Sequence, residues 1–336
     1  MHVEKLQFLG TEAILASPRM RELFAQVRKV AQSDATVYLV GESGTGKEVV
    51  TRALHHYSPR REHPFVDLSC AALPEDLVEA ELFGHERGAF SGASAAKPGL
   101  LEAAHHGTLF LDGIGELSPR LQSKLLRFLE TKTFHRIGAV KPTKADVRIV
   151  AASNQPLDVA VAAGRFRQDL SQRLALATLR IPPLRERPEE IEALASHFLA
   201  QQNPELLFAA DAFIALHSYR WPGNVRELRN TVLRSALLAK GPLLHADDLL
   251  FAPKTKAHSP GNSQGKYAAP PPLREGVSGH EPALIRRALK DAGGIRQRAA
   301  AALGISRATL TRKMRLYGLG LEETPKLEQL RSKRGL

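Results

Sequence analysis

The chain has 336 residues, more than the roughly 250 to 300 at which one hydrophobic core stops growing, so we expect more than one domain. Its composition, 43% hydrophobic and 24% charged, excludes wholesale disorder, collagen and low-complexity classes. The single cysteine, Cys70, excludes a disulfide framework and favours a reducing compartment. Because no apolar run approaches the roughly 18 residues that cross a bilayer, we predict a cytoplasmic protein with no membrane partner.

The net charge of +12 is concentrated at the C-terminal end of the chain. Residues 252–336 contain 17 basic and 6 acidic residues, whereas residues 1–251 contain 30 basic and 29 acidic ones. A compact basic segment is typical of proteins that bind a polyanion, most often nucleic acid, because phosphate contacts release condensed counterions. A basic tail that is merely solvated is the alternative.

In chain order, a short N-terminal extension (1–13) precedes alternating strand-like and helical segments over residues 14–181. The extension is too short for a receiver or ligand-sensing domain, so we expect regulation through abundance, a partner protein or a ligand. The alternation predicts a parallel sheet with helices on its faces. The predicted strands are 36–40, 65–68, 108–111 and 147–152, and the predicted helices between them include 48–56 and 121–130.

Residues 182–251 favour a small all-helical subdomain, because apolar residues recur at helical spacing through 191–198, 213–216 and 225–238. A stretch rich in Pro, Gly and Ser follows at 252–281, and we interpret it as a flexible linker of roughly 30 Å.

A glycine-rich loop follows the first predicted strand and opens a helix. Glycines there let backbone N–H groups converge on phosphate oxygens, and Lys47 supplies a positive charge for the β and γ phosphates. Glu48 stands where the general motif has Ser or Thr to contact magnesium. The predicted nucleotide-binding residues of this loop are Gly41, Glu42, Ser43, Gly44, Thr45, Gly46, Lys47 and Glu48.

An acidic residue, Asp112, ends the strand-like run LFLD. After a phosphate loop, such an acid is expected to hold Mg²⁺, directly or through water. Asp112 is therefore the predicted metal and catalytic residue. A strand-end aspartate that only forms a turn is the alternative.

Together, six motifs resemble the AAA+ domain of bacterial enhancer-binding proteins, the activators of sigma-54 RNA polymerase. The likeness runs from about residue 14 to residue 250. The motifs are GESGTGKE (41–48), ELFGHERGAFSGA (81–93), GTLFLDGIGELS (107–118), FRQDLSQRL (166–174), PPLRERPEEI (182–191) and WPGNVRELRN (221–230).

The resemblance implies a hexameric ATPase ring, dimeric when inactive, that holds ATP and Mg²⁺ between neighbours. Asn154 and Arg226 match the family's sensor residues, and Arg167 and Arg173 match its candidate arginine fingers, although either arginine could instead form a surface ion pair. The loop that contacts sigma-54 in the family corresponds to Gly88, Ala89, Phe90, Ser91, Gly92 and Ala93, with Ser91 in place of the usual threonine. A buried Phe90 that anchors a turn is the alternative.

Two residues depart from the family pattern. Gly113 replaces the glutamate that aligns and deprotonates the attacking water, and Ser69 replaces an asparagine that pairs with that glutamate. Loss of a positioned base costs about 10² to 10⁴ in rate, so we expect ATP binding with slow hydrolysis. In the alternative, Glu42 or Glu116 serves as the base.

The C-terminal part predicts a helix-turn-helix over residues 282–320, with helices at 283–290, 297–303 and 306–317 and a basic tail at 321–336. It resembles the Fis-type DNA-binding domain of the same family. Leu310 and Met314 are available for packing, and a charged helix that packs on the ring is the alternative. The predicted DNA-binding residues are Ser306, Arg307, Thr309, Arg312 and Arg315.

These features favour a sigma-54-dependent transcriptional regulator that binds ATP, contacts sigma-54 RNA polymerase through the GAFSGA loop and holds double-stranded DNA upstream of promoters. The alternative hypothesis is a DNA-binding regulator that uses nucleotide for assembly and does not remodel the polymerase. A generic AAA+ machine such as a helicase loader explains neither the loop nor the basic end.

Overall fold

The structure is a computed structural model that describes residues 3–251 and, beyond them, residues 289, 297, 299, 300, 310, 311 and 314. The chain divides into two compact units, Met1–Thr255 and Lys256–Leu336. Within the described residues, no helix is both long and apolar enough to cross a membrane.

A five-stranded parallel sheet forms the centre of the first unit, with the strand order β11-β3-β10-β7-β4. Its strands are β3 (Val37–Val40), β4 (Phe65–Ser69), β7 (Thr108–Asp112), β10 (Arg148–Ser153) and β11 (Ala177–Arg180). Every pairing between neighbours is parallel. The predicted parallel sheet is therefore confirmed, with strand ends that differ by one residue and with β11 as a strand that the sequence had not indicated.

Helices cover both faces of this sheet and enclose a separate core on each side. On one face, α1 (Pro18–Ala31) and α2 (Lys47–His56) pack with side chains such as Leu39, Phe110 and Val150. On the other face, α3 (Glu75–Phe83), α5 (Pro119–Thr131) and α7 (Gln168–Leu174) pack with Leu109, Leu111 and Ile149. Successive side chains along each strand point to opposite faces of the sheet, so each strand contributes to both cores. Because both faces are buried, the strands read as continuous apolar runs in the sequence.

Local signals fix where two of these helices begin. Ser17 precedes α1, and its Oγ accepts a hydrogen bond from the backbone N–H of Met20 at 3.2 Å. Ser118 does the same for α5 through the N–H of Leu121 at 3.4 Å. In both helices the next residue is proline, whose missing N–H costs nothing at the first helical position.

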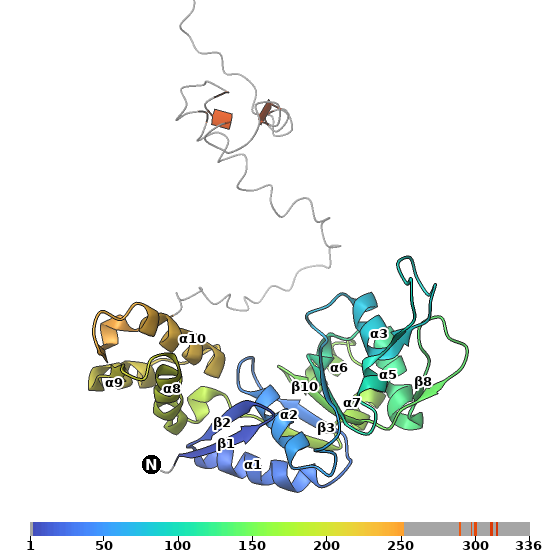
Figure 1. Cartoon of the computed structure of the whole chain (residues 1–336), viewed down its shortest axis with the longest axis horizontal. Coiled ribbons are helices and arrows are strands. Elements are labelled where there is room, and N and C mark those ends of the chain that lie inside the picture. The colour runs from blue at the N-terminus through green and yellow to red at the C-terminus, as the bar shows by residue number, and fades with distance from the viewer. Residues whose placement is uncertain are drawn as a thin grey trace, which may run out of the picture. The chain divides into compact units, whose positions relative to one another are not determined.

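Residues 182–251, called the lid subdomain from here on, are a mainly helical cluster with its own core around the fully buried Trp221. It contains α8 (Glu189–Gln202), α9 (Ala210–Ser218) and α10 (Asn224–Leu237), which lie together at one end of the unit in Figure 1. The expectation that this region contains helices only was wrong. Strands β12 (Leu207–Phe208) and β13 (Leu243–Leu244) form a short parallel pair. This pair joins residues far apart in sequence, so no local pattern indicated it.

A β-hairpin stands at the N-terminus, where the sequence indicated only an extension. Strands β1 (Glu4–Phe8) and β2 (Thr11–Leu15) pair antiparallel, so the predicted boundary after residue 13 falls inside β2. Phe8 and Leu15 are buried in the core that α1 and α2 share. The remaining short elements of the unit are β5 (Gly84–His85), β6 (Lys97–Pro98), α4 (Leu100–Ala103), β8 (Thr133–Phe134), β9 (Thr143–Lys144), α6 (Leu157–Ala162) and the 3₁₀ turns Ile114–Glu116, Leu184–Glu186 and Ala246–Asp248.

Candidate functional site

The glycine-rich loop connects the end of β3 to the start of α2, as the sequence predicts. Gly44 has φ 77°, and a Cβ at this position would lie 2.4 Å from the carbonyl oxygen of Gly223. Gly46 has φ 103° and directly precedes α2. Only glycine allows this left-handed backbone together with the close approach of the lid. The loop therefore places the free N-terminal amides of α2 at its centre, where they can bind an anion.

Lys47 lies at the bottom of the loop and is almost fully buried. Its Nζ donates hydrogen bonds to the carbonyl oxygens of Gly41 at 2.8 Å and Glu42 at 3.1 Å, and to Oδ1 of Asn154 at 2.7 Å. Burial lowers the pKa of Lys47, and the negative charge of Asp112 opposes this shift. The start of α2 and the ends of β10 and β7 thus bring the predicted residues Lys47, Asn154 and Asp112 together.

Asp112 is the last residue of β7 and lies opposite Ser69 of β4 in the sheet register. Within the described residues, its carboxylate makes no hydrogen bond and no ion pair, so its oxygens are available to a ligand. No group of three or more His, Cys, Asp or Glu side chains among the described residues could hold a metal ion by itself. The donors present suit Mg²⁺, which binds through one or two carboxylates together with substrate phosphates.

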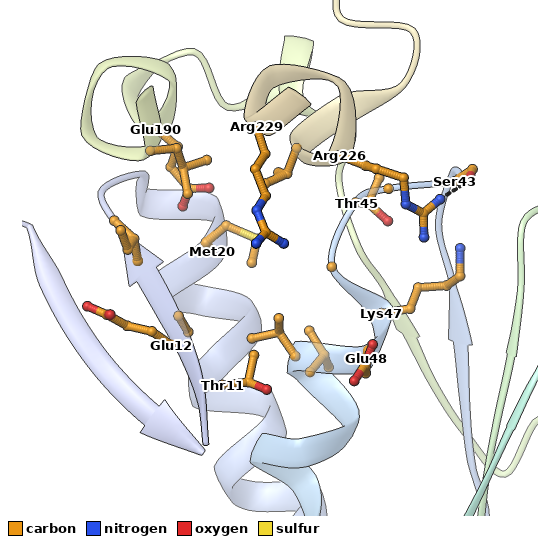
Figure 2. Close-up of a pocket in the computed structure, with 18 of the residues that line it drawn as sticks. Thr11, Glu12, Met20, Ser43, Thr45, Lys47, Glu48, Glu190, Arg226 and Arg229 are labelled. Carbon is orange, nitrogen blue, oxygen red and sulfur yellow. Dashed lines mark hydrogen bonds between the residues drawn. The ribbon is translucent and has the colours of Figure 1, made fainter. Parts of the chain in front are cut away.

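These residues line a cavity of about 550 Å³ between the P-loop, the N-terminal hairpin and the lid. Figure 2 shows side chains from all three parts converging on it. Residues at the phosphate-loop end are polar, and an apolar wall at the other end suits a base. That wall comprises Ile14, Leu15, Met20, Phe24, Leu194, Phe198 and Val225.

The lid contacts the tip of the P-loop directly through the start of α10. The backbone N–H of Val225 donates to the Gly44 carbonyl oxygen at 3.0 Å, and Nη1 of Arg226 donates to Oγ of Ser43 at 2.9 Å. The Asn224 amide donates to the Ser43 carbonyl oxygen at 3.0 Å and to the Glu42 carboxylate at 3.2 Å. The orientation of the lid is therefore tied to the conformation of the loop.

A buried ion pair joins the lid to the loop from the other side. Arg187 donates to Oε2 of Glu190 at 2.8 Å and to the carbonyl oxygen of Thr45 at 2.7 Å. Glu190 also accepts a hydrogen bond from Oγ of Ser17 at 3.2 Å. Because both side chains are buried, each charge depends on the other for compensation.

Gly113 follows Asp112 and carries no group that could activate water. It adopts φ 75° and ψ 35°, and its N–H donates to the carbonyl oxygen of Ala152 at 2.9 Å. Neither alternative base is well placed. Glu116 is exposed and does not line the cavity. The Glu42 carboxylate accepts hydrogen bonds from Nη1 and Nη2 of Arg185 at 2.8 and 2.6 Å, and this contact lowers the pKa of Glu42.

The two candidate arginine fingers do not reach the cavity of their own chain. Arg167 precedes α7 and pairs with the Asp169 carboxylate at 2.7 Å, while Arg173 lies exposed near the end of the same helix. Neither residue lines the nucleotide cavity. The geometry thus matches the surface ion pair considered for Arg167 and leaves both side chains accessible to another molecule.

The GAFSGA segment (88–93) is a tight loop whose two ends are held by hydrogen bonds and ion pairs. The N–H of Gly88 donates to the Ala93 carbonyl oxygen at 2.8 Å, and Gly88 and Gly92 both have positive φ. Phe90 is 45% exposed, which argues against a buried anchor, and its ring contacts that of His85. Arg136 fixes the base by pairing with Glu86 at 3.1 Å and Glu102 at 2.6 Å.

The described residues of the second unit agree with the three predicted helices. Leu289 lies in the first, Gln297, Ala299 and Ala300 in the second, and Leu310, Thr311 and Met314 in the third, and all seven are helical. Leu310 and Met314 are buried, as predicted for packing positions. The predicted DNA-binding residues Ser306, Arg307, Thr309, Arg312 and Arg315 lie outside the described residues.

Several residues of the cavity had not been predicted from the sequence. The hairpin residues Thr11 to Leu15 carry no motif, and Asn224 and Arg187 sit in recognised motifs without a recognised role. Arg229 could have been found, because it lies three residues after Arg226 on the same helix and so shares its face.

Comparison with known proteins covers nearly the whole chain. The Sigma-54 interaction domain matches residues 13–180, the AAA+ ATPase lid domain matches residues 185–266, and the bacterial regulatory protein, Fis family, matches residues 280–317. The lid match extends into the predicted linker. The chain therefore belongs to the family of sigma-54-dependent transcriptional activators, with an AAA+ ATPase domain followed by a DNA-binding helix-turn-helix, which confirms the predicted family and fold.

Individual relatives support this assignment. Regulatory protein AtoC of Escherichia coli is 42% identical over 308 residues, which are 90% of this chain and 67% of AtoC. Nitrogen fixation protein AnfA of Azotobacter vinelandii is 42% identical over 323 residues, or 95% of this chain and 60% of AnfA. The solved structure of NtrX from Brucella abortus in complex with ADP has a TM-score of 0.66 and 33% identity, covering 91% of this chain and 70% of NtrX. NtrX has also been solved in complex with ATP, with a TM-score of 0.65 and 34% identity over 91% of this chain and 68% of NtrX. The chain thus spans only about two thirds of the length of these relatives.

Proposed function

We propose that this protein is a sigma-54-dependent transcriptional regulator that binds ATP in its AAA+ domain and hydrolyses it slowly. The observation that carries the proposal is the convergence of Lys47, Asp112, Asn154 and Arg226 on one cavity whose far wall is apolar. A polar end that carries Lys47, Arg226 and the P-loop amides, next to an apolar end, suits a nucleoside triphosphate. ATP is proposed because the related NtrX binds it in a solved structure.

The P-loop, Lys47, Asp112 and Arg226 each have a part in this proposal. The P-loop amides and Lys47 bind the β and γ phosphates once Lys47 exchanges the carbonyl oxygens of Gly41 and Glu42 for phosphate oxygens. Asp112 holds Mg²⁺, directly or through water. Arg226 contacts the phosphates from the lid, so that the lid responds to their presence. Mg²⁺ supplies positive charge that offsets the charge on the transferring phosphoryl group.

Slow hydrolysis follows from the missing base. Gly113 offers only a backbone N–H, and that group already donates to Ala152. Glu42 is engaged by Arg185, and Glu116 is exposed and does not line the cavity. Without a positioned carboxylate the rate falls by about 10² to 10⁴.

In the assembled protein, a hexameric ring places Arg167 and Arg173 against the nucleotide of the next subunit, with a dimer as the inactive form. The GAFSGA loop contacts sigma-54 RNA polymerase, and the half-exposed Phe90 is the side chain that it presents. The helix-turn-helix holds double-stranded DNA upstream of the promoter, with Arg307 and Arg312 on bases and Arg315 on phosphate.

Phosphate release from Mg²⁺-ATP tests the hydrolysis proposal in the unmodified protein, Gly113→Glu and Gly113→Ala. Both variants bear the left-handed backbone at this position, which costs a non-glycine residue about 1 to 2 kcal/mol, so alanine is the matched control for strain. We expect Gly113→Glu to be faster than both of the others. Turnover by the unmodified protein as fast as by Gly113→Glu would contradict the proposal.

A second candidate function is a DNA-binding regulator in which nucleotide supports assembly without remodelling of the polymerase. The combination of Gly113 and Ser69 favours it, because both members of the water-activating pair are absent. In vitro transcription with sigma-54 polymerase separates the two functions. Only the first predicts ATP-dependent open complexes, and these should disappear in Phe90→Ala.

A further inference from the structure

Arg229 is an arginine of the nucleotide cavity to which the proposed function assigns no role. It lies on α10, and Figure 2 shows its side chain extending from the lid helix into the space above the P-loop. Within the described part of the chain, Arg229 makes no hydrogen bond and no ion pair. Its guanidinium therefore keeps all five donors available to a ligand.

The other lysine and arginine side chains of the cavity are already engaged. Lys47 donates to Asn154 and two carbonyl oxygens, Arg187 is paired with Glu190, and Arg226 donates to Ser43. The same cavity is lined by the carboxyl groups of Glu12, Glu48, Asp67, Asp112 and Glu190. Four lysine and arginine side chains thus face five carboxyl groups, a charge balance that disfavours an anion unless each free cation contributes.

Position along α10 indicates which part of the nucleotide Arg229 reaches. Arg226 contacts Ser43 at the tip of the P-loop, where the proposed function places the β and γ phosphates. Three residues later on the same helix, Arg229 is displaced by about 4.5 Å along the axis and remains on the same face. That displacement carries it from the loop tip toward the apolar wall formed by residues such as Met20 and Leu194. The junction of the polar and apolar ends is where the α phosphate and ribose of a nucleotide lie.

We propose that Arg229 binds the α phosphate of the nucleotide as a second lid arginine. The inference rests on the proposed function, because it requires that the cavity bind a nucleotide. A guanidinium suits this task, since its planar fork donates two parallel hydrogen bonds to phosphate oxygens. With Arg226 at the β and γ phosphates and Arg229 at the α phosphate, the lid contacts the whole phosphate chain.

Equilibrium competition against radiolabelled ATP measures the affinities of ATP, ADP, AMP and adenosine for the unmodified protein and Arg229→Gln. The matched control is Arg234→Gln, which changes the same residue type on the same helix outside this cavity. We expect Arg229→Gln to weaken ATP, ADP and AMP alike by about tenfold or more, the effect of one charge-assisted hydrogen bond. Adenosine affinity and the Arg234→Gln profile should remain unchanged, and Arg229→Lys should restore part of the loss. Since Arg229 is exposed, the variant should unfold at the same temperature as the unmodified protein.

Any other pattern of affinities would overturn the inference, and each such pattern has its own interpretation. Equal affinities in Arg229→Gln and the unmodified protein would show that Arg229 touches no ligand. Loss of ATP affinity alone would assign the contact to the γ phosphate, and an equal loss for adenosine would assign it to the base. No measurable ATP binding by the unmodified protein would overturn the proposed function itself.

Discussion

Replacing Arg187 with methionine should destabilise the lid more than most single substitutions in this protein. The substitution removes the partner of Glu190, whose carboxylate is fully buried and otherwise contacts Ser17. It also leaves the carbonyl oxygen of Thr45 without its 2.7 Å donor. Breaking one side of a buried ion pair costs about 3 to 5 kcal/mol, because the remaining charge is uncompensated. For a unit of this size, the loss corresponds to a fall in Tm of about 6 to 20 °C.

The same variant has a pH dependence of defined sign. Burial raises the pKa of Glu190 above its ordinary value of 4.5, and Arg187 opposes that shift, so removal of Arg187 raises the pKa further. Between the unfolded and the folded pKa the native state holds more protons than the unfolded state. The free energy of unfolding therefore falls as pH rises through this window. The deficit of Arg187→Met should be larger at about pH 8 than at about pH 6.

Trp221 provides the assay, because it is the only tryptophan of the chain and is buried in the lid core. Urea unfolding followed by its fluorescence reports the lid, in which both charged residues lie. The controls are Glu190→Gln and the double variant, and the double variant should lose less than the sum of the two single losses. A loss below about 1 kcal/mol for Arg187→Met, or strict additivity, would refute the reasoning.

Three further outcomes are expected. Arg148→Met should lose about 2 to 5 kcal/mol in urea unfolding, because it orphans the carbonyl oxygens of Ala31 and Val30 at the end of α1; a loss below about 1 kcal/mol would contradict this. Burial raises the pKa of Cys70 to about 12, so a thiol reagent at about pH 8 should react only after denaturant is added, and rapid labelling of the native protein would argue otherwise. Phe90→Ala should change the unfolding free energy by less than about 1 kcal/mol, whereas Phe134→Ala in the core should lose about 3 to 5 kcal/mol; similar losses would place Phe90 in the core.

Features that depend only on neighbouring residues could be predicted from the sequence. The P-loop, Asp112 and the central strands were predicted because glycine conformation, strand patterning and the residue order of a phosphate site are all local properties. Helix starts at Ser17-Pro18 and Ser118-Pro119 are local in the same sense. The edge strand β11 escaped because its residues alternate between exposed and buried positions, which gives it no continuous apolar run.

By itself, the sequence determined the sheet, the P-loop, the acid that follows it and the absence of a glutamate at Gly113, since each depends on neighbouring residues. Only the tertiary structure decided that the N-terminal hairpin forms a wall of the cavity, that Asn224 and Arg187 join the lid to the P-loop, and that Arg229 lines the same cavity. The contacts of Asn224 and Arg187 with the P-loop join residues more than 100 positions apart. Their formation depends on how the packed cores orient the lid against the sheet, and no local pattern records that orientation.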